Sequence, residues 1–397
     1  MMKIKITSLA LVFIIIQGCS KIESGPIGSS GITTEKIFQS FIILHPDTVA
    51  YKSVAKSYKW NYEQGLILEA FYRMWKLSGD EKYYDYVKKN IDYYLESDGK
   101  IKTYKLKDYN LDNIAPGRQL LHLYSKTGEE KYKKAADLLM KQLQEQPRTS
   151  EGGFWHKKRY PYQMWLDGLY MAEPFYVKYA VVFNEQKYFD DVAKQFILIQ
   201  KHLKDKVTGL YFHGWDESKE QKWSDPETGQ SSSFWGRSIG WFMMAMIDVL
   251  DSFPDDHPDR ITIENMFIEL AEALLKFRDT DKKLWYQVVD KPDLEGNYIE
   301  TSSSLMFIYS FARGVNKGFL PDTYFKIAEE SFNSLLNNYI TIDKNDNLYL
   351  QNTVSVGGLG GNPYRDGSFE YYISEPIRIN DFKGYGPLML ASIELKM

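Results

Sequence analysis

Residues 77–83 read LSGDEKY, and close variants of this turn recur as KTGEEKY at 126–132 and as FNEQKY at 183–188. An apolar, aromatic helical pattern precedes each turn, and an amphipathic pattern with Lys and Asp on one face follows it. A recurrence of this kind indicates an internal structural repeat. The repeating unit is therefore a helical hairpin, with an inner-type helix followed by an outer-type helix.

The same alternation continues along the chain. Inner-type helices are expected near residues 60–77, 113–125, 162–182, 235–250, 300–313 and 384–396. Outer-type helices are expected near 81–96, 129–145, 186–203, 262–277 and 322–339, and a helix near 33–44 supplies the outer partner of the last inner one. No region is rich in strand patterns. Six hairpins predict an all-α fold, a closed (α/α)6 barrel or toroid, as one domain over residues 33–397.

The lengths of the connections predict where a functional site lies. Three inner-to-outer turns are short, whereas the outer-to-inner connections near 97–112, 146–161, 204–234, 278–299 and 340–383 are long. Long connections in a compact domain are usually functional or disordered. The alternation places all of them at the end of the barrel where the inner helices begin. Helix N-termini gathered there favour an anionic ligand.

The composition excludes some classes of function. The 397 residues carry a net charge of −4, which gives no basic footprint for nucleic acid. There is no zinc, EF-hand or G-x-S-x-G pattern, so we expect no metal site and no serine nucleophile. Aromatic residues make up 15% of the chain. They could stack on a flat ligand or fill a tyrosine-rich core.

The N-terminus has the pattern of a targeting segment. Lys3 and Lys5 precede an apolar run at 9–16 that is too short for a permanent membrane helix. Cys19, the only cysteine, follows Gly18 as in a bacterial lipobox. We expect a signal peptide over 1–18, a flexible tether over 19–32, and a lipid on Cys19 that anchors the protein in the bacterial cell envelope. The alternative is an ordinary signal peptide cleaved nearby.

Two aspartates are candidates for acid–base chemistry. Asp167 begins a helix after the stretch SEGGFWHKKRYPYQMWLDGLY at 150–170, in an aromatic and apolar setting. A carboxyl group there, with His156 in the preceding loop, suggests proton transfer, although such an acid could simply complement the helix dipole. Asp112 holds the matching position before the preceding inner helix. By itself it could be an N-cap, and with Asp167 it becomes a candidate second carboxylate.

Aromatic residues and one arginine recur at other inner-helix starts. Trp60 opens the first inner helix, and Trp235, Arg237 and Trp241 open the fourth. The rings could stack on a sugar and the guanidinium could bind a carboxylate, although core packing and a structural ion pair are the alternatives. His213 lies in a long connection. Like His156 in the earlier loop, it could donate hydrogen bonds to the hydroxyl groups of a substrate. Glycines at 357–361 lack the features of a phosphate loop and suggest a lid.

Several motifs together carry a family resemblance. They are the run beginning at Trp60, LDNIAPG at 111–117, GGFWH at 152–156, MWLDG at 164–168, HGW at 213–215, WGR at 235–237 and DGSFEYY at 366–372. With them the chain resembles glycoside hydrolase family 105, the unsaturated rhamnogalacturonyl hydrolases, and more distantly the unsaturated glucuronyl hydrolases. The resemblance implies the (α/α)6 barrel, with Asp167 as general acid and base and Asp112 assisting. It implies these substrate-contacting positions: Trp60, His156, His213, Trp235, Arg237 and Trp241.

The chemistry implied by the resemblance is hydration of a double bond. Polysaccharide lyases leave a 4,5-unsaturated uronate at the nonreducing end of an oligosaccharide, and the expected enzyme removes that sugar without a cofactor. Two alternatives remain from the residues alone. An inverting glycosidase on the same barrel also uses two carboxylates. A non-catalytic glycan-binding lipoprotein would need the aromatic residues and the arginine but not Asp167.

Overall fold

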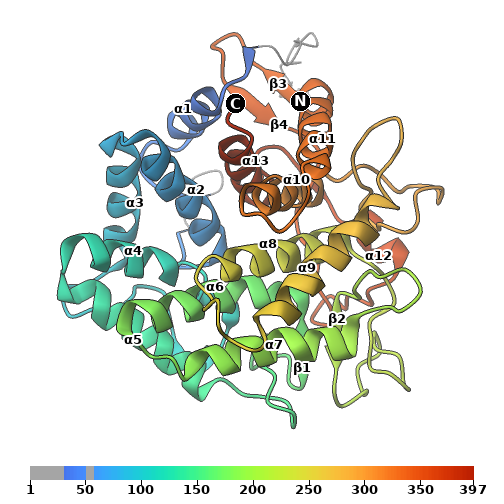
Figure 1. Cartoon of the computed structure of the whole chain (residues 1–397), viewed down its shortest axis with the longest axis horizontal. Coiled ribbons are helices and arrows are strands. Elements are labelled where there is room, and N and C mark those ends of the chain that lie inside the picture. Colours follow the sequence, from blue (N-terminus) through green and yellow to red (C-terminus); the bar gives the residue numbers. More distant parts are fainter. Residues whose placement is uncertain (1–30, 51–57) are drawn as a thin grey trace, which may run out of the picture.

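A computed structural model describes residues 31–50 and 58–397, and six of its helices form a closed inner ring (Figure 1). They are α2 (Tyr62–Ser78), α4 (Gly117–Thr127), α6 (Leu166–Phe183), α8 (Gly236–Leu250), α10 (Thr301–Asn316) and α13 (Phe382–Glu394). Each contacts the next in this order, and α13 returns to contact α2. The ring is therefore closed by helices from the two ends of the chain.

The second helix of each hairpin packs outside the ring. These outer helices are α1 (Thr34–Leu44), α3 (Glu81–Tyr94), α5 (Glu130–Glu145), α7 (Tyr188–Leu203), α9 (Arg260–Leu275) and α11 (Thr323–Tyr339). Each of the last five contacts the inner helix before it, and α1 contacts α13. The predicted all-α (α/α)6 fold is confirmed, with most boundaries within a few residues of those expected.

Each repeated turn contains a residue that caps the C-terminus of the inner helix before it. Gly79, Gly128 and Asn184 end α2, α4 and α6 in the left-handed region, with φ of 71°, 69° and 56°. Glycine adopts this conformation without strain, and asparagine tolerates it better than most residues. After the first turn, the Asp80 side chain accepts a hydrogen bond from the backbone N–H of Lys82 and caps α3. The LSGDEKY motif thus ends one helix and starts the next.

Two inner helices begin later than predicted, and both differences affect the site. The second was expected near 113, but α4 begins at Gly117, and residues Leu111–Asn113 form the separate 3₁₀ turn η5. Pro116 disfavours helix at the residue before it, so the two do not merge. Asp112 therefore lies on η5 and not at the helix start. The third was expected near 162, but residues Gln163–Trp165 form strand β1, and α6 follows.

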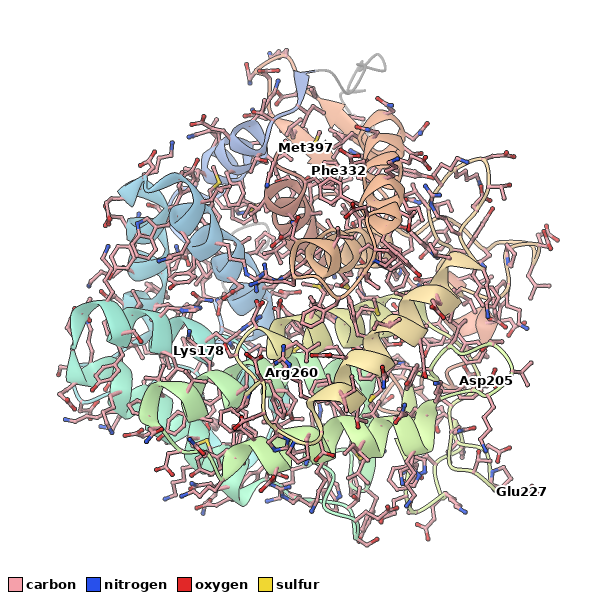
Figure 2. The ribbon with its side chains drawn as sticks, in the orientation of Figure 1. Lys178, Asp205, Glu227, Arg260, Phe332 and Met397 are labelled. Atoms are coloured by element: carbon pink, nitrogen blue, oxygen red, sulfur yellow. The ribbon has the colours of Figure 1, made fainter. Side chains whose placement is uncertain are left out.

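Short elements in the connections were not predicted. They comprise η4 (Leu106–Asp108), β1 with β2 (Gly214–Asp216), β3 (Ile340–Ile342) with β4 (Leu348–Leu350), β5 (Thr353–Val354) with β6 (Ile377–Arg378), and helix α12 (Phe369–Ser374). Each strand pair is antiparallel. The α7–α8 connection, which carries Asp205 and Glu227, extends to the edge of the molecule (Figure 2). The β1–β2 pair joins this connection to the start of α6.

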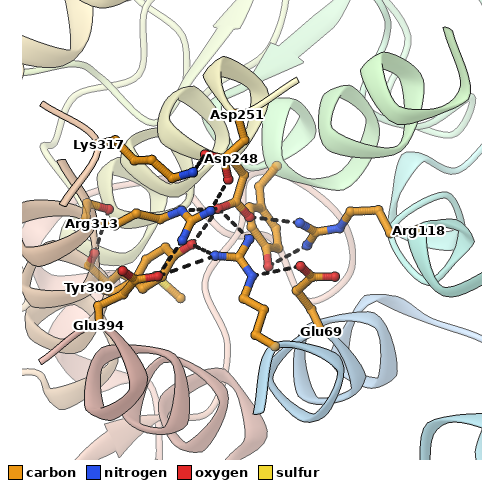
Figure 3. Close-up of polar contacts among 12 residues, drawn as sticks. Glu69, Arg118, Asp248, Asp251, Tyr309, Arg313, Lys317 and Glu394 are labelled. Atoms are coloured by element: carbon orange, nitrogen blue, oxygen red, sulfur yellow. Dashed lines mark hydrogen bonds and ion pairs between the residues drawn. The ribbon is translucent and has the colours of Figure 1, made fainter. Parts of the chain in front are cut away.

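A buried polar network crosses the axis of the ring away from the helix starts (Figure 3). Asp248 of α8 accepts hydrogen bonds from Arg73 of α2 at 2.9 Å, Arg118 of α4 at 2.8 Å and Tyr309 of α10 at 2.5 Å. Arg118 also donates to Tyr170 of α6 at 2.7 Å. Arg313 of α10 pairs with Glu394 of α13. Every inner helix thus contributes a side chain to one network.

The chain ends meet where the barrel closes. The backbone N–H of Thr34 donates to the carbonyl oxygen of Met397 at 3.2 Å, and its hydroxyl donates to the Ser392 carbonyl at 2.9 Å. Met397 is labelled beside these elements in Figure 2. The predicted signal segment and Cys19 lie outside the described residues. Among the helices of the described part, none combines the length and the apolar character needed to cross a membrane.

Candidate active site

A cavity opens at the end of the barrel where the inner helices begin. Its lining comprises Tyr62, Asp112, His156, Lys157, Arg159, Tyr160, Trp165, Asp167, Met171, Trp235, Arg237, Trp241, Val356, Gly357, Arg365 and Lys383. The first turns of α2, α6, α8 and α13 supply Tyr62, Asp167, Arg237 and Lys383. Six of the eight residues proposed from the sequence line this cavity. The other two, Trp60 and His213, lie behind its wall.

Asp167 is held by the β1–β2 pair. It lies in the first turn of α6, directly after β1, and the N–H of Leu166 donates to the carbonyl oxygen of His213 at 3.0 Å. This contact brings the His213 Nε2 atom to 3.1 Å from Asp167 Oδ2. The Nδ1 atom of His213 lies 2.7 Å from the hydroxyl of Tyr372 on α12. His213 is 0% exposed, whereas the Asp167 side chain is 13% exposed and faces the cavity.

The surroundings of Asp167 act on its pKa in opposite directions. Burial raises the pKa, and the charge and hydrogen bonding of His213 lower it more. The net pKa lies below the ordinary value for an aspartate. Burial raises the pKa of Tyr372 well above its usual range, so its hydroxyl keeps its proton.

Asp112 has a different environment on η5. Its Oδ2 pairs with Lys157 Nζ, and its Oδ1 lies 3.5 Å from His156 Nε2. Burial and the charge of Lys157 lower the pKa of His156 well below its usual range, so this histidine is neutral. Trp60 donates from its indole N–H to the Asn113 carbonyl at 2.8 Å. The structure therefore places Trp60 as a support for the turn that carries Asp112.

Aromatic rings form much of the cavity wall. Trp165 stacks against His156 at 4.6 Å and against Tyr160 at 5.0 Å between ring centroids. The ring of Trp235 stacks on Tyr372 at 5.5 Å. A Cβ atom on Gly357 would lie 2.3 Å from the Trp235 ring, so the first glycine of the 357–361 segment packs directly over the indole. Gly357 thus forms part of the cavity wall, and the role of the segment as a lid stays a prediction.

Arg237 is almost wholly enclosed, with 1% exposure. Its Nη1 donates to the Val354 carbonyl at 2.5 Å, and its guanidinium lies 5.0 Å from the Trp235 ring centroid. The backbone of β5 therefore fixes the guanidinium at the cavity wall. Its role toward a carboxylate stays a prediction.

Four further cations in the lining were not singled out from the sequence. Lys383 contacts Glu63 and Asp381, both at 2.7 Å, and Arg365 donates to the Tyr160 hydroxyl at 2.9 Å. Lys157 and Arg159 are visible in the sequence as the basic run at 157–159, but such runs usually form a solvated surface. With Arg237, five cations surround two carboxylates, so the cavity favours an anionic ligand. Among the described residues, no cluster of His, Cys, Asp and Glu is arranged to hold a metal ion.

Known proteins match the chain over most of its length. The family model of Glycosyl Hydrolase Family 88 matches residues 33–397. A solved glycoside hydrolase from family 105 of C. acetobutylicum ATCC 824 is 43% identical, with a TM-score of 0.86 over 91% of this chain and 98% of that one. The unsaturated rhamnogalacturonyl hydrolase YesR of Bacillus subtilis is 28% identical over 65% of this chain and 72% of its own length. Protein Atu3128 of Agrobacterium fabrum is 37% identical over 56% of this chain and 97% of its own length.

Proposed function

Since the chain belongs to glycoside hydrolase family 88/105, we propose that it removes a 4,5-unsaturated uronic acid from the nonreducing end of lyase-generated oligosaccharides of the rhamnogalacturonan type. The observation that carries the proposal is the placement of Asp167. Its carboxyl group faces a cation-rich, aromatic cavity, with the buried His213 in contact behind it. The name of the Bacillus subtilis relative supports the substrate class.

The proposed reaction begins with a proton transfer. Protonated Asp167 gives its proton to C4 of the enol ether, and positive charge develops at C5 and the ring oxygen. Water then adds to C5 and loses a proton to a carboxylate, Asp167 or Asp112. The resulting hemiketal opens to a ketone at C5, and the hemiacetal left at C1 collapses and releases the next sugar. Every proton is returned, and the net change is the addition of one water molecule.

Substrate binding would raise the pKa of Asp167 toward the value that this role needs. In the free site the net pKa is low because His213 stabilises the carboxylate. A uronate carboxylate placed in the cavity adds a like charge, and the sugar removes water, and both effects favour the protonated form. His213 would then act on the pKa and orientation of Asp167 and not on a sugar hydroxyl. This assignment replaces the direct substrate contact suggested by the sequence.

The test is turnover by Asp167→Asn, which keeps the shape of the side chain but cannot donate a carboxylic proton. Loss of general acid–base assistance should lower kcat about 10²- to 10⁴-fold with little change in KM. Asp112→Asn should also lower kcat, by a smaller factor. The assay follows loss of the ultraviolet absorbance of the unsaturated sugar, with thermal melting as the control for folding.

The outcomes separate the alternatives. A folded Asp167→Asn variant with normal turnover would remove Asp167 from the chemistry. If the wild-type protein cleaves saturated substrates and leaves the chromophore intact, it is an ordinary inverting glycosidase. If it binds the oligosaccharide and changes neither, it is a glycan-binding lipoprotein.

We further propose that a lipid on Cys19 anchors the protein in a bacterial cell envelope. The support is the sequence alone, in which the basic and apolar segment ends at Gly18-Cys19. Cys19→Ala should move the protein from the membrane fraction to the soluble fraction after lysis, while catalysis is unchanged. Unaltered fractionation of the variant would contradict lipid anchoring.

A further inference from the structure

A groove adjoins the active-site cavity on the side of Asp112. It is lined by Lys107, Asp108, Asn110, Asp112, Lys157, Lys158 and Arg159, and we call it the basic groove. Asp112, Lys157 and Arg159 also line the cavity. The cavity and the basic groove are therefore neighbours that share these three side chains.

The basic groove carries an excess of positive charge. Lys157 pairs with Asp112, so the charges of these two residues offset each other. The remaining charged residues of the lining are three cations, Lys107, Lys158 and Arg159, and one anion, Asp108. None of these three cations lies within ion-pair distance of a carboxylate of the described residues. Lys158 lies 5.4 Å from the Tyr109 ring centroid and Arg159 lies 4.9 Å from that of Tyr160. These contacts hold the two side chains without neutralising them.

The two segments that form the basic groove are fixed to each other by their backbones. The N–H of Lys158 donates to the Tyr109 carbonyl at 3.1 Å, and the N–H of Leu111 donates to the His156 carbonyl at 3.2 Å. The Gln146 side chain donates to the carbonyls of both Tyr109 and Trp155, at 2.9 and 2.8 Å. The cationic side chains of the basic groove thus extend from backbone segments beside Asp112 that hydrogen bonds hold in place. Such preorganisation lowers the entropy lost when a charged ligand is bound.

We propose that the basic groove binds a second anionic group of the substrate, carried by a sugar beyond the bond that is cut. The inference rests on the proposed function, because it takes the cavity as the site of the unsaturated uronate. The ligand chemistry is a carboxylate or a sulfate ester on the released part of the oligosaccharide. The preferred substrates are then polyanionic oligosaccharides longer than one uronate and one neutral sugar, or sulfated disaccharides.

The test uses Lys107→Gln/Lys158→Gln, because these two lysines line the groove and not the cavity. Three substrates are compared: an unsaturated disaccharide with a neutral second sugar, an unsaturated tetrasaccharide with a second uronate, and a disaccharide with a sulfated second sugar. We expect equal kcat/KM for variant and wild type on the neutral disaccharide. On an anionic substrate that uses the groove, kcat/KM should fall about 3- to 10-fold, mainly through KM. The loss should shrink in about 0.5 M salt, because salt screens exposed charges.

Two controls assign the loss to the groove. Lys326→Gln/Lys344→Gln removes the same charge from exposed positions on α11 and in the β3–β4 turn, and should match wild type on every substrate. The tetrasaccharide with its second carboxylate reduced to an alcohol should be cleaved equally by the groove variant and wild type.

A loss on the tetrasaccharide identifies a carboxylate as the ligand of the groove, and a loss on the sulfated disaccharide identifies a sulfate. Equal kinetics of variant and wild type on both anionic substrates overturns the proposal. Failure of wild type on all three unsaturated substrates contradicts the proposed function instead. The groove is then judged by calorimetric binding of the tetrasaccharide to wild type and to the groove variant.

Discussion

At the scale of single residues, the site depends on how Asp167 is supported from behind. Asp167 at the start of α6 contacts His213 at 3.1 Å, and His213 contacts the hydroxyl of Tyr372, so two different connections support the carboxyl group. His213 lowers the pKa of Asp167 in the free protein, although burial acts in the opposite direction. The histidine therefore sets the pH range in which the acid carries its proton.

We expect His213→Gln to extend activity to higher pH. Without His213, its charge and hydrogen bonding no longer offset burial, so the pKa of Asp167 rises and the protonated form persists to higher pH. In the plot of kcat/KM against pH, the fall in rate that reports loss of this proton should move to higher pH. The value of kcat should also decrease, because the carboxyl group of Asp167 is less well oriented without His213. The measurement is a pH–rate profile of variant and wild type, with circular dichroism as a folding control. A limb at the same pH in both proteins would show that His213 does not tune this acid.

At the scale of elements, the helices followed from the sequence and the contacts between connections did not. The turn repeat and the helical periodicity are local signals, and they located the hairpins and the active end. The β1–β2 pair has three residues in each strand, which is too short for a sequence pattern to show, and it helps to bring His213 to Asp167. Tyr372 is 159 residues from the histidine that it contacts, on a helix that was not predicted. The sequence identified Asp167 as a candidate acid from its residue type and position. That His213 and Tyr372 support it could be found only from the three-dimensional course of the loops.

A close approach between α2 and the segment before α4 gives a prediction at this scale. A Cβ atom on Gly65 would lie 2.7 Å from the backbone nitrogen of Pro116 and 2.8 Å from the Ala115 carbonyl carbon. Gly65→Ala should therefore push this segment, with Asp112 on η5, and cost about 1–3 kcal/mol of stability. Gly314→Ala, which meets only the side chains of Leu320 and Phe267, is the matched control. Both should lower the free energy of unfolding in urea, but only Gly65→Ala should lower kcat.

At the scale of the whole molecule, the network on Asp248 links the inner helices across the barrel axis. Arg73, Arg118 and Arg313 outweigh the effect of burial and hold the pKa of Asp248 below its usual value. A carboxylate with a depressed pKa stabilises the fold above its unfolded pKa, and the stabilisation is lost as the pH falls through the folded value. This part of the stability should therefore be complete near neutral pH and decline below about pH 4.

Asp248→Asn should destabilise the barrel by about 3–5 kcal/mol, because buried guanidinium groups lose their counter-charge. The free energy of unfolding is measured in urea at neutral and acid pH. The loss should be largest near neutral pH and smaller at acid pH, where the wild-type carboxylate also becomes protonated. Asp47→Asn, at a side chain with 86% exposure, should change stability little. A pH-independent loss for Asp248→Asn would point to packing and not to charge.

The hydrogen bond between Thr34 and Met397 has a consequence for how the protein would stand on a bilayer. Outer helices run opposite to inner ones, so α1 starts at the end of the barrel where α13 finishes, which is the end remote from the cavity. A tether that enters at residue 33 therefore attaches to the rear of the barrel. With Cys19 lipidated, the lipid would be joined to the side of the barrel opposite the mouth of the cavity, so the mouth could face away from the lipid headgroups. Polyanionic fragments could then reach it without approaching the negatively charged bilayer surface.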